Sequence, residues 1–337
     1  MKAYQIRDEW SLEHIELVEI PKPSPGPGEV LVEMKASSLN YRDMVVANRG
    51  YGSKTGNLPL IPVSDGVGIV RELGDGVSRV AIGDRICPLF MQGWISGPPN
   101  RERLSTTLGG PIDGVMAEFR CFPQDSVSKV PEELTDLEAS TLPCAALTAW
   151  SALVEEGKLQ PGESVLIQGT GGVSLFALQF AKICGARCIL ISGSNEKMKR
   201  AQELGADEVL NYQDLPEWGK RVRDFSGGEG VDHIVEVGGP ETLPQSLRAI
   251  RPGGTISMIG VLSGSEMKAQ LGLIVTRQIR LQGITVGHRD GFEAMASAIN
   301  ASGMKPIVDQ VYPFTSLPEA MHSLSEAKHF GKICLEF

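Results

Sequence analysis

The spacing of hydrophobic positions differs between two regions of the chain. Up to about residue 125, short apolar runs such as EVLVEMKA and GVGIVREL are bounded by glycine or proline, which is typical of strands in an antiparallel or barrel-like sheet. Beyond Pro131, short apolar runs such as SVLIQG alternate with amphipathic stretches such as VSLFALQFAKICG, until about residue 267. This alternation indicates βαβ units and a parallel sheet. The sequence therefore predicts an α/β protein with a β-rich first part.

Composition excludes several classes of partner. The chain has 337 residues, enough for about two domains, and a formal net charge of −9. Nucleic acids and anionic membrane surfaces need a basic face on their partner, so neither is expected. The start, MKAYQIRDEW, lacks the apolar core of a signal peptide, and no run approaches the ~18 apolar residues of a membrane helix. Six cysteines without a CxxC pair favour reduced, buried thiols, and we expect a soluble cytoplasmic protein.

A glycine-rich turn, GTGGVS, follows one of the predicted strands and precedes a predicted helix. That context is the one in which a dinucleotide-binding fingerprint occurs. Its glycines permit a tight turn and a close approach of the backbone to a pyrophosphate, and the helix N-terminus supplies N–H groups and a positive dipole. A plain strand-to-helix turn without a ligand is the alternative. The predicted cofactor-binding residues of the turn are Gly169, Thr170, Gly171, Gly172, Val173 and Ser174, the last standing where the fingerprint has Gly or Ala.

The end of the next predicted strand distinguishes NADP from NAD. An NAD site usually places Asp or Glu there to bind the ribose 2′-hydroxyl. Here the strand RCILIS is followed by Gly193, Ser194 and Asn195, with no carboxylate at the tip. Lys197 could bind a 2′-phosphate or be an ordinary surface lysine. The missing carboxylate is the stronger argument, and it favours NADPH over NADH.

Several separated motifs resemble the medium-chain dehydrogenase/reductase superfamily over nearly the whole chain. The resemblance implies a GroES-like β-rich catalytic domain formed by residues 1–125 and 268–337, and a Rossmann NADP-binding domain formed by residues 126–267. It also implies a cofactor in the cleft between the two domains. The motifs are GPGEVLVEMKASSLNYRD, IPVSDGVGIV, GDGVSRVAIGDRI, LPCAALTAWSAL, the glycine turn and GKICLEF.

The zinc alcohol dehydrogenases of this superfamily hold a catalytic zinc on Cys, His and Cys. The residues here that match these ligands are Asn40, Ser64 and Cys144, so only one ligand side chain is retained. The region matching the lobe with four structural-zinc cysteines, 91–112, contains no cysteine. A catalytic zinc needs three protein ligands and an open position. We therefore predict catalysis without a metal.

This departure makes the chain similar to the zinc-independent branch, which includes quinone oxidoreductases and enone reductases. The resemblance implies hydride transfer from NADPH to a quinone or an α,β-unsaturated carbonyl, with a hydrogen-bond donor stabilising the charge that develops on oxygen. The predicted catalytic residues are Asn40, Tyr41 and Ser64. The resemblance places Gly193, Ser194, Lys197 and Tyr212 at the NADPH 2′-phosphate, Thr148, Val286 and Gly287 at the nicotinamide, and Lys332 near the pyrophosphate, with Arg289 as a phosphate ligand or a surface residue.

Alternatives stay open at each level. Asn40 could cap backbone and Tyr41 could serve packing, and Asp43 and Asp65 are expected as structural hydrogen-bond anchors. The enzyme could instead be an NADP-dependent alcohol dehydrogenase or aldehyde reductase, or the chain a non-catalytic NADPH-binding protein resembling the lens crystallins. A homodimer is expected because relatives pair the sheet edges of their cofactor domains, and the apolar run 270–286 could serve this purpose.

Overall fold

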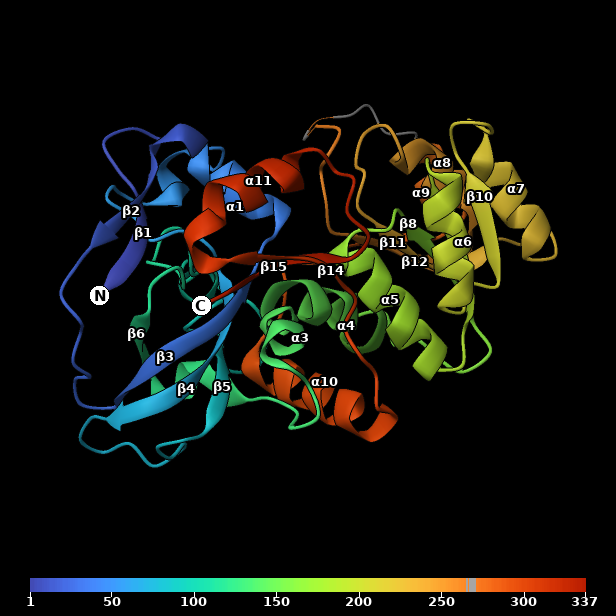
Figure 1. The fold of residues 1–337 in the computed structure, drawn as a ribbon. Coiled ribbons are helices and arrows are strands. Elements are labelled where there is room, and N and C mark those ends of the chain that lie inside the picture. The colour runs from blue at the N-terminus through green and yellow to red at the C-terminus, as the bar shows by residue number, and fades with distance from the viewer. Residues whose placement is uncertain (265, 267–270) are drawn as a thin grey trace. The chain divides into compact units, whose positions relative to one another are not determined.

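The computed structural model describes residues 1–264, 266 and 271–337, and these form two compact units (Figure 1). Residues 1–147 and 286–337 make the first unit, and residues 148–285 make the second. The sequence placed the two junctions at 125/126 and 267/268. The first junction lies later because α3 (Asp136–Ser140) packs on the first unit, where the Ser38 hydroxyl donates to the Ser140 carbonyl. The second lies later because β13 (Arg280–Gly283) pairs with β12 (Ile250–Met258) of the second unit.

The first unit is built on a seven-stranded sheet in the order β14-β15-β3-β4-β5-β7, with β6 paired to β3. All pairs in it are antiparallel except β14 with β15, which confirms the β-rich first part. β1 and β2, which precede β3 in the chain, form a separate two-stranded antiparallel sheet. The strands are β1 (Lys2–Ile6), β2 (Ile15–Glu19), β3 (Glu29–Ser38), β4 (Asp65–Leu73), β5 (Arg85–Pro88), β6 (Phe119–Pro123), β7 (Val127–Lys129), β14 (Val308–Pro313) and β15 (Lys332–Glu336).

Side chains that alternate along these strands form the core of the first unit. Val30, Val32 and Met34 of β3 are fully or almost fully buried, and they pack in one cluster with Ile86 and Phe122. Leu31, on the opposite face of the strand, is fully buried as well, so β3 is covered on both faces over part of its length. The helices of the unit are α1 (Tyr41–Ala47), α2 (Arg101–Leu104), α3, α10 (Arg289–Ser302) and α11 (Leu317–Ser325), with 3-10 turns at Leu12–His14, Gly52–Thr55, Gln124–Ser126 and Phe314–Ser316.

The second unit contains a six-stranded sheet in the order β10-β9-β8-β11-β12-β13, and every pair in it is parallel. The predicted parallel sheet is therefore confirmed. In chain order the strands read 3-2-1-4-5-6, the order of a dinucleotide-binding fold, and the direction of winding reverses between β8 and β11. The strands are β8 (Ser164–Gln168), β9 (Arg187–Ser192), β10 (Glu208–Asn211), β11 (Val231–Glu236), β12 and β13.

Burial along the central strands follows from this topology. In β8, β9 and β11 nearly every side chain is buried, because helices cover both faces of a parallel sheet. Leu166, Ile189 and Ile234 belong to one core cluster with Trp218 and Leu247 of the neighbouring helices. The helices are α5 (Gly172–Ile183), α6 (Asn195–Glu203), α7 (Trp218–Phe225), α8 (Leu243–Ala249) and α9 (Leu271–Thr276). A further helix, α4 (Leu147–Trp150), is flanked by two π-helical turns, Leu142–Ala146 and Ser151–Glu155.

The expected dimer segment, 270–286, has its first residue outside the described part of the chain. Within the described part, β13 ends the order of the six-stranded sheet, and Leu271, Val275 and Leu281 are exposed by 66%, 73% and 41%. A homodimer stays a prediction. Among the residues that the structure describes, none of the helices combines the length and apolar composition needed to cross a lipid bilayer.

Candidate cofactor and catalytic sites

The glycine turn of the second unit has the geometry of an anion-binding site. Gly169 follows β8 with a φ of 74°, a left-handed conformation that favours glycine. Gly171 is the N-cap of α5, with φ −79° and ψ −177°, and a Cβ built there would meet no heavy atom within 4 Å. The first N–H groups of an α-helix have no intrahelical acceptor, and α5 begins at Gly172 with open space in front of it. A pyrophosphate fits this arrangement.

Ser174, the residue that departs from the fingerprint, is accommodated by a specific hydrogen bond. Its hydroxyl donates to the Gln168 carbonyl at 2.6 Å, and the residue is buried on the first turn of α5. The small side chain therefore ties the start of the helix back to the end of β8. Thr170 is also buried, and Gly172 and Val173 are the first two residues of α5.

The residues expected around the 2′-phosphate gather at the end of β9. Ser194 is the N-cap of α6, and its hydroxyl accepts the Lys197 backbone N–H at 3.4 Å. A Cβ at Gly193 would lie 2.8 Å from the Tyr212 hydroxyl, so the tyrosine stands directly over this glycine. The Gln213 side chain lies over Gly193 as well, with its Nε2 2.9 Å from the position that a Cβ of residue 193 would take. The sequence did not select Gln213, and only its position after Tyr212 could have suggested it.

A buried group of polar side chains occupies the first unit, where β3, β4, β15 and the π-helical turn converge. Lys332, at the start of β15, donates from Nζ to the Asn40 Oδ1 at 2.7 Å and to the Leu39 carbonyl. Asp65, at the start of β4, accepts the Ser64 hydroxyl at 2.7 Å and the Cys144 backbone N–H at 2.9 Å. The structure therefore brings together the predicted residues Asn40, Ser64 and Lys332.

Two buried carboxyl groups control the electrostatics of this group. Burial raises the pKa of Asp43 to about 6, against the opposing effect of the Arg42 guanidinium. Burial also raises the pKa of Asp65, and the Lys332 ammonium opposes that rise. Asp43 Oδ2 accepts the Asn40 backbone N–H at 2.7 Å, whereas its Oδ1 has no hydrogen-bond partner among the described residues. As expected from the sequence, both carboxylates act as hydrogen-bond anchors.

Lys332 fixes the orientation of the Asn40 side-chain amide. Because a lysine ammonium only donates, the contact with Lys332 fixes Oδ1 toward the ammonium and Nδ2 away from it. Nδ2 is buried without a hydrogen bond to the described residues, yet the amide lowers the pKa of Asp65 and so lies close to that carboxyl. The Asp65 carboxyl is therefore the acceptor near Nδ2, without a hydrogen bond of normal geometry, and Nδ2 is a candidate donor to a ligand oxygen.

Two tyrosines border this part of the first unit. Tyr41, a predicted catalytic residue, is 54% exposed at the first position of α1. Tyr51 was not selected from the sequence. Burial of part of the side chain raises the pKa of its phenol, against the positive charge of the nearby Arg42 guanidinium, and the residue as a whole is 47% exposed. Arg42 itself stacks over Phe90 and donates to the Leu108 carbonyl at 2.9 Å, so it is held in place beside Tyr51.

The backbone at two predicted site segments is strained. Val63, which precedes Ser64, and Val286 have φ values of 68° and 56°, in the left-handed region that β-branched residues rarely adopt. Such conformations cost about 1–3 kcal/mol each and cluster at functional sites. Both valines are buried, and Gly287 follows the second of them. The surrounding packing therefore fixes the chain path at Ser64 and at the expected nicotinamide segment.

The remaining predicted cofactor residues have these surroundings. Thr148 is buried in α4. Arg289, on the first turn of α10, donates to the Asp125 carbonyl at 3.0 Å and forms an ion pair with the Asp125 carboxylate at 3.2 Å. Lys332 is 3% exposed and already has two acceptors. Each of the two cations is thus held by acceptors within the first unit.

The residues at the expected zinc position do not fit a catalytic zinc. Asn40 presents an amide, Ser64 a hydroxyl, and both carboxylate oxygens of Asp65 accept hydrogen bonds. Of the three residues at the ligand positions, Cys144 alone keeps a side chain that zinc commonly binds, and a catalytic zinc needs three protein ligands. Within the described ranges, no group of three or more His, Cys, Asp or Glu side chains could hold a metal ion.

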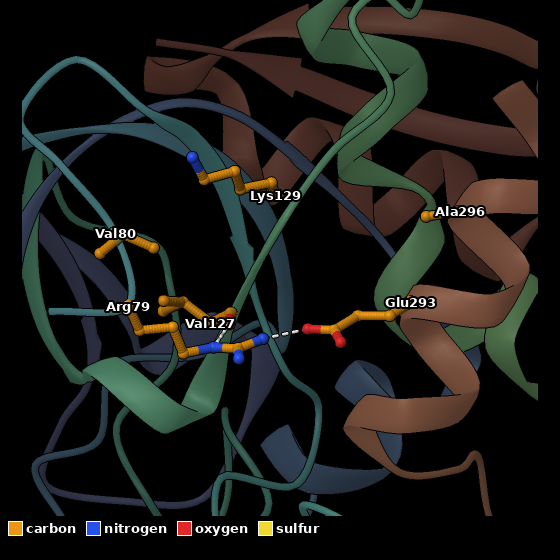
Figure 2. Close-up of a pocket in the computed structure, with 6 residues that line it drawn as sticks. All are labelled: Arg79, Val80, Val127, Lys129, Glu293 and Ala296. Atoms are coloured by element: carbon orange, nitrogen blue, oxygen red, sulfur yellow. Dashed lines mark hydrogen bonds and ion pairs between the residues drawn. The ribbon is translucent and has the colours of Figure 1, made fainter.

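A cavity of about 330 Å³ lies elsewhere in the first unit (Figure 2). Arg79 and Glu293 form an ion pair at this cavity, and Glu293 also accepts the Ser128 hydroxyl at 3.1 Å. None of the predicted site residues lines it, so it is not part of the candidate site. The lining residues are Arg79, Val80, Val127, Lys129, Glu293 and Ala296.

Comparison with known proteins identifies relatives over the whole chain. The model of the alcohol dehydrogenase GroES-like domain matches residues 26–132, and that of the zinc-binding dehydrogenases matches residues 172–301. A zinc-type alcohol dehydrogenase-like protein of Schizosaccharomyces pombe, C1773.06c, is 38% identical over 324 residues, which cover 94% of this chain and 93% of that protein.

Solved structures agree with this result. The structure of a proposed alcohol dehydrogenase from Sinorhizobium meliloti has a TM-score of 0.94 at 41% identity, covering 100% of this chain and 98% of that one. An NAD-dependent alcohol dehydrogenase has a TM-score of 0.90 at 32% identity, with full coverage of both chains. Mycobacterial Rv1454c, solved as a complex with NADPH, has a TM-score of 0.83 at 26% identity, also with full coverage.

Proposed function

Because the chain belongs to the medium-chain dehydrogenase/reductase superfamily, of the alcohol dehydrogenase-like type, we propose that it is a zinc-independent oxidoreductase that transfers hydride from NADPH to a quinone or an α,β-unsaturated carbonyl. The donor set at the expected metal position is the observation that carries this proposal. Asn40 and Ser64 stand where two zinc ligands would be, and the carboxylate beside them is satisfied by Ser64 and Cys144. Two similar structures, an NAD-dependent alcohol dehydrogenase and the NADPH complex of Rv1454c, support the assignment as an oxidoreductase that uses a nicotinamide cofactor.

The expected chemistry needs little from the protein beyond orientation and charge stabilisation. The bound cofactor supplies the hydride. When hydride adds to the β-carbon of an enone, negative charge develops on the carbonyl oxygen, and a hydrogen-bond donor aimed at that oxygen stabilises it. Asn40 Nδ2 is such a donor, held in orientation by Lys332. The Tyr51 phenol, beside the Arg42 guanidinium, is the candidate proton donor for the product.

The assay that tests this function uses purified protein, NADPH and a panel of small acceptors. We expect reduction of a quinone or of an enone C=C bond, at an unchanged rate after treatment with a chelator. Loss of activity with chelator, or chelator-sensitive oxidation of a simple alcohol, would contradict the metal-free proposal. Names of relatives favour an alcohol dehydrogenase as the second candidate, so product analysis must separate C=C from C=O reduction.

We expect Lys197→Ala to raise the KM for NADPH by about 10- to 100-fold, because a charge-assisted contact with the 2′-phosphate would be lost. The KM for NADH, which lacks that phosphate, should stay within about twofold. Lys199→Ala is the matched control, since Lys199 is an exposed lysine on the same helix. Steady-state kinetics with both cofactors give the result. Equal effects of the Lys197 substitution on the two KM values would remove the lysine from 2′-phosphate recognition.

We expect Tyr51→Phe to lower kcat by about 10- to 100-fold while leaving the Kd for NADPH unchanged, because it removes one proton donor and no cofactor contact. Tyr41→Phe is the comparison, since Tyr41 is a similarly exposed tyrosine of the same unit, at 54% against 47% for Tyr51. Pre-steady-state and steady-state rates with one enone would separate hydride transfer from protonation. If Tyr41→Phe lowers kcat and Tyr51→Phe does not, Tyr51 is not the proton donor, and Tyr41, a catalytic residue in the sequence prediction, takes its place.

A further inference from the structure

The central strands of the second unit, β8 and β11, are tied by side chains at both ends. At their amino ends, the Ser164 hydroxyl donates to Asp232 Oδ2 at 2.7 Å. At their carboxyl ends, Gln168 Nε2 donates to Glu236 Oε2 at 2.6 Å. Gln168 and Glu236 are the last residues of their strands. Both ties join the two strands between which the winding of the sheet reverses, but only that of Gln168 with Glu236 lies at their carboxyl ends.

Glu236 is a fully buried carboxylate whose hydrogen-bond donors among the described residues are all neutral. Its Oε1 accepts the backbone N–H groups of Gly238 at 3.0 Å and Gly239 at 3.1 Å, and the Thr242 hydroxyl. Its Oε2 accepts Gln168 Nε2 and the Ser246 hydroxyl. Five donors thus converge on one side chain that is 0% exposed. Both carboxyl oxygens are thus used to join the end of β11 to the loop that follows it, to Gln168 of β8 and to the start of α8.

The contacts of Gln168 extend this cluster to the phosphate-binding turn. Its carbonyl accepts the Ser174 hydroxyl from the first turn of α5. Its Oε1 accepts the N–H groups of Val237 at 3.2 Å and Gly238 at 3.3 Å. Gln168 and Glu236 therefore connect the turn 169–174, which follows β8, to the loop 237–239, which follows β11.

In a doubly wound sheet, a dinucleotide binds across the carboxyl ends of the strands where the winding reverses. The turn 169–174 lies on one side of that point and the loop 237–239 on the other. We propose that Gln168 and Glu236 are positioning residues for the cofactor, which fix the spacing of these two segments so that one NADPH molecule can contact both. This inference rests on the proposed function, because it assumes that the turn binds NADPH.

The test compares Glu236→Gln with Ser164→Ala, which removes the side-chain hydrogen bonds of Ser164 at the opposite end of the same strands while its backbone N–H still donates to Asp232. We expect Glu236→Gln to raise the Kd for NADPH by about tenfold or more. The Kd for adenosine 2′,5′-bisphosphate, which carries only the adenosine half, should change by less than about twofold. Ser164→Ala should lower the unfolding midpoint without changing either Kd. Calorimetric titration and thermal unfolding supply both measurements.

The outcomes separate this inference from the proposed function. If Glu236→Gln and Ser164→Ala leave the Kd for NADPH equally unchanged, the tie at the carboxyl ends is only structural and the inference is wrong. If the wild-type protein itself binds no NADPH and reduces no acceptor, the proposed function fails instead. Gln168→Met, which keeps the chain length but removes both hydrogen-bonding groups, decides the question if Glu236→Gln does not fold. A loss of affinity for NADPH with the adenosine fragment unaffected would then support the inference.

Discussion

Replacing Gly171 with valine should abolish cofactor binding while leaving the fold intact. The glycine has an extended backbone conformation that any residue adopts, and a Cβ there meets no protein atom within 4 Å. The added side chain would project into the space in front of the first N–H groups of α5, where a pyrophosphate must approach the backbone closely. We expect the Kd for NADPH to rise by at least about 100-fold, measured by fluorescence titration, and the unfolding free energy to fall by less than about 1 kcal/mol.

Gly169→Ala is the contrasting variant. Gly169 has a φ of 74°, so a side chain there is strained whatever space surrounds it. We expect a loss of about 1–2 kcal/mol in the free energy of unfolding, with a smaller effect on the Kd. Urea unfolding of the two variants separates a glycine needed for its conformation from one needed for the ligand. If Gly171→Val still binds NADPH tightly, the turn is only a structural strand-to-helix connection.

The phosphate turn shows what a local sequence pattern can predict. A strand, a glycine-rich turn and a helix are neighbours in the chain, so their order alone fixed the geometry at Gly169 and Gly171. The hydrogen bond that Ser174 donates could not be predicted. Its acceptor is the backbone carbonyl of residue 168, which every amino acid has, so no side chain in the sequence indicates the pair. The parallel sheet was predicted for the same local reason, since continuous apolar strands alternate with amphipathic helices.

The buried group of the first unit required long-range information. Asn40 and Lys332 are 292 residues apart, and Asp65 and Cys144 are 79 apart. Family resemblance selected Asn40, Ser64 and Lys332, but it did not indicate that Lys332 would hold the Asn40 amide. Tyr51 lies in a loop with no periodic pattern, and only the fold brings it to Arg42. The junctions between the units differ from the predicted ones for a similar reason. The unit to which α3 or β13 belongs depends on the residues that each contacts, and its own composition does not show them.

Asp43→Asn should stabilise the protein at pH 8 much more than at pH 4. Asp43 is fully buried, and burial raises its pKa from 3.8 to about 6. The folded protein therefore holds this proton more tightly than the unfolded chain. The resulting stability is complete below about pH 4 and is lost as the pH rises through 6. Asparagine cannot ionise, so its advantage over wild type should grow to about 3 kcal/mol above pH 7. It also keeps an oxygen that accepts the Asn40 N–H.

Glu33→Gln provides a control of opposite sign. Glu33 pairs with Lys35 at 2.7 Å and with Arg71 at 2.5 Å, and the hydrogen bond from Lys35 is the main cause of its lowered pKa. Its contribution to stability is present above about pH 4.5 and disappears as the pH falls, so Glu33→Gln should destabilise the protein at pH 8 and have little effect below pH 4. Urea unfolding of both variants and wild type at several pH values gives these differences. A difference between Asp43→Asn and wild type that does not change with pH would mean that the pKa of Asp43 is the same in the folded protein and in the unfolded chain, with Arg42 and Lys332 offsetting the effect of burial.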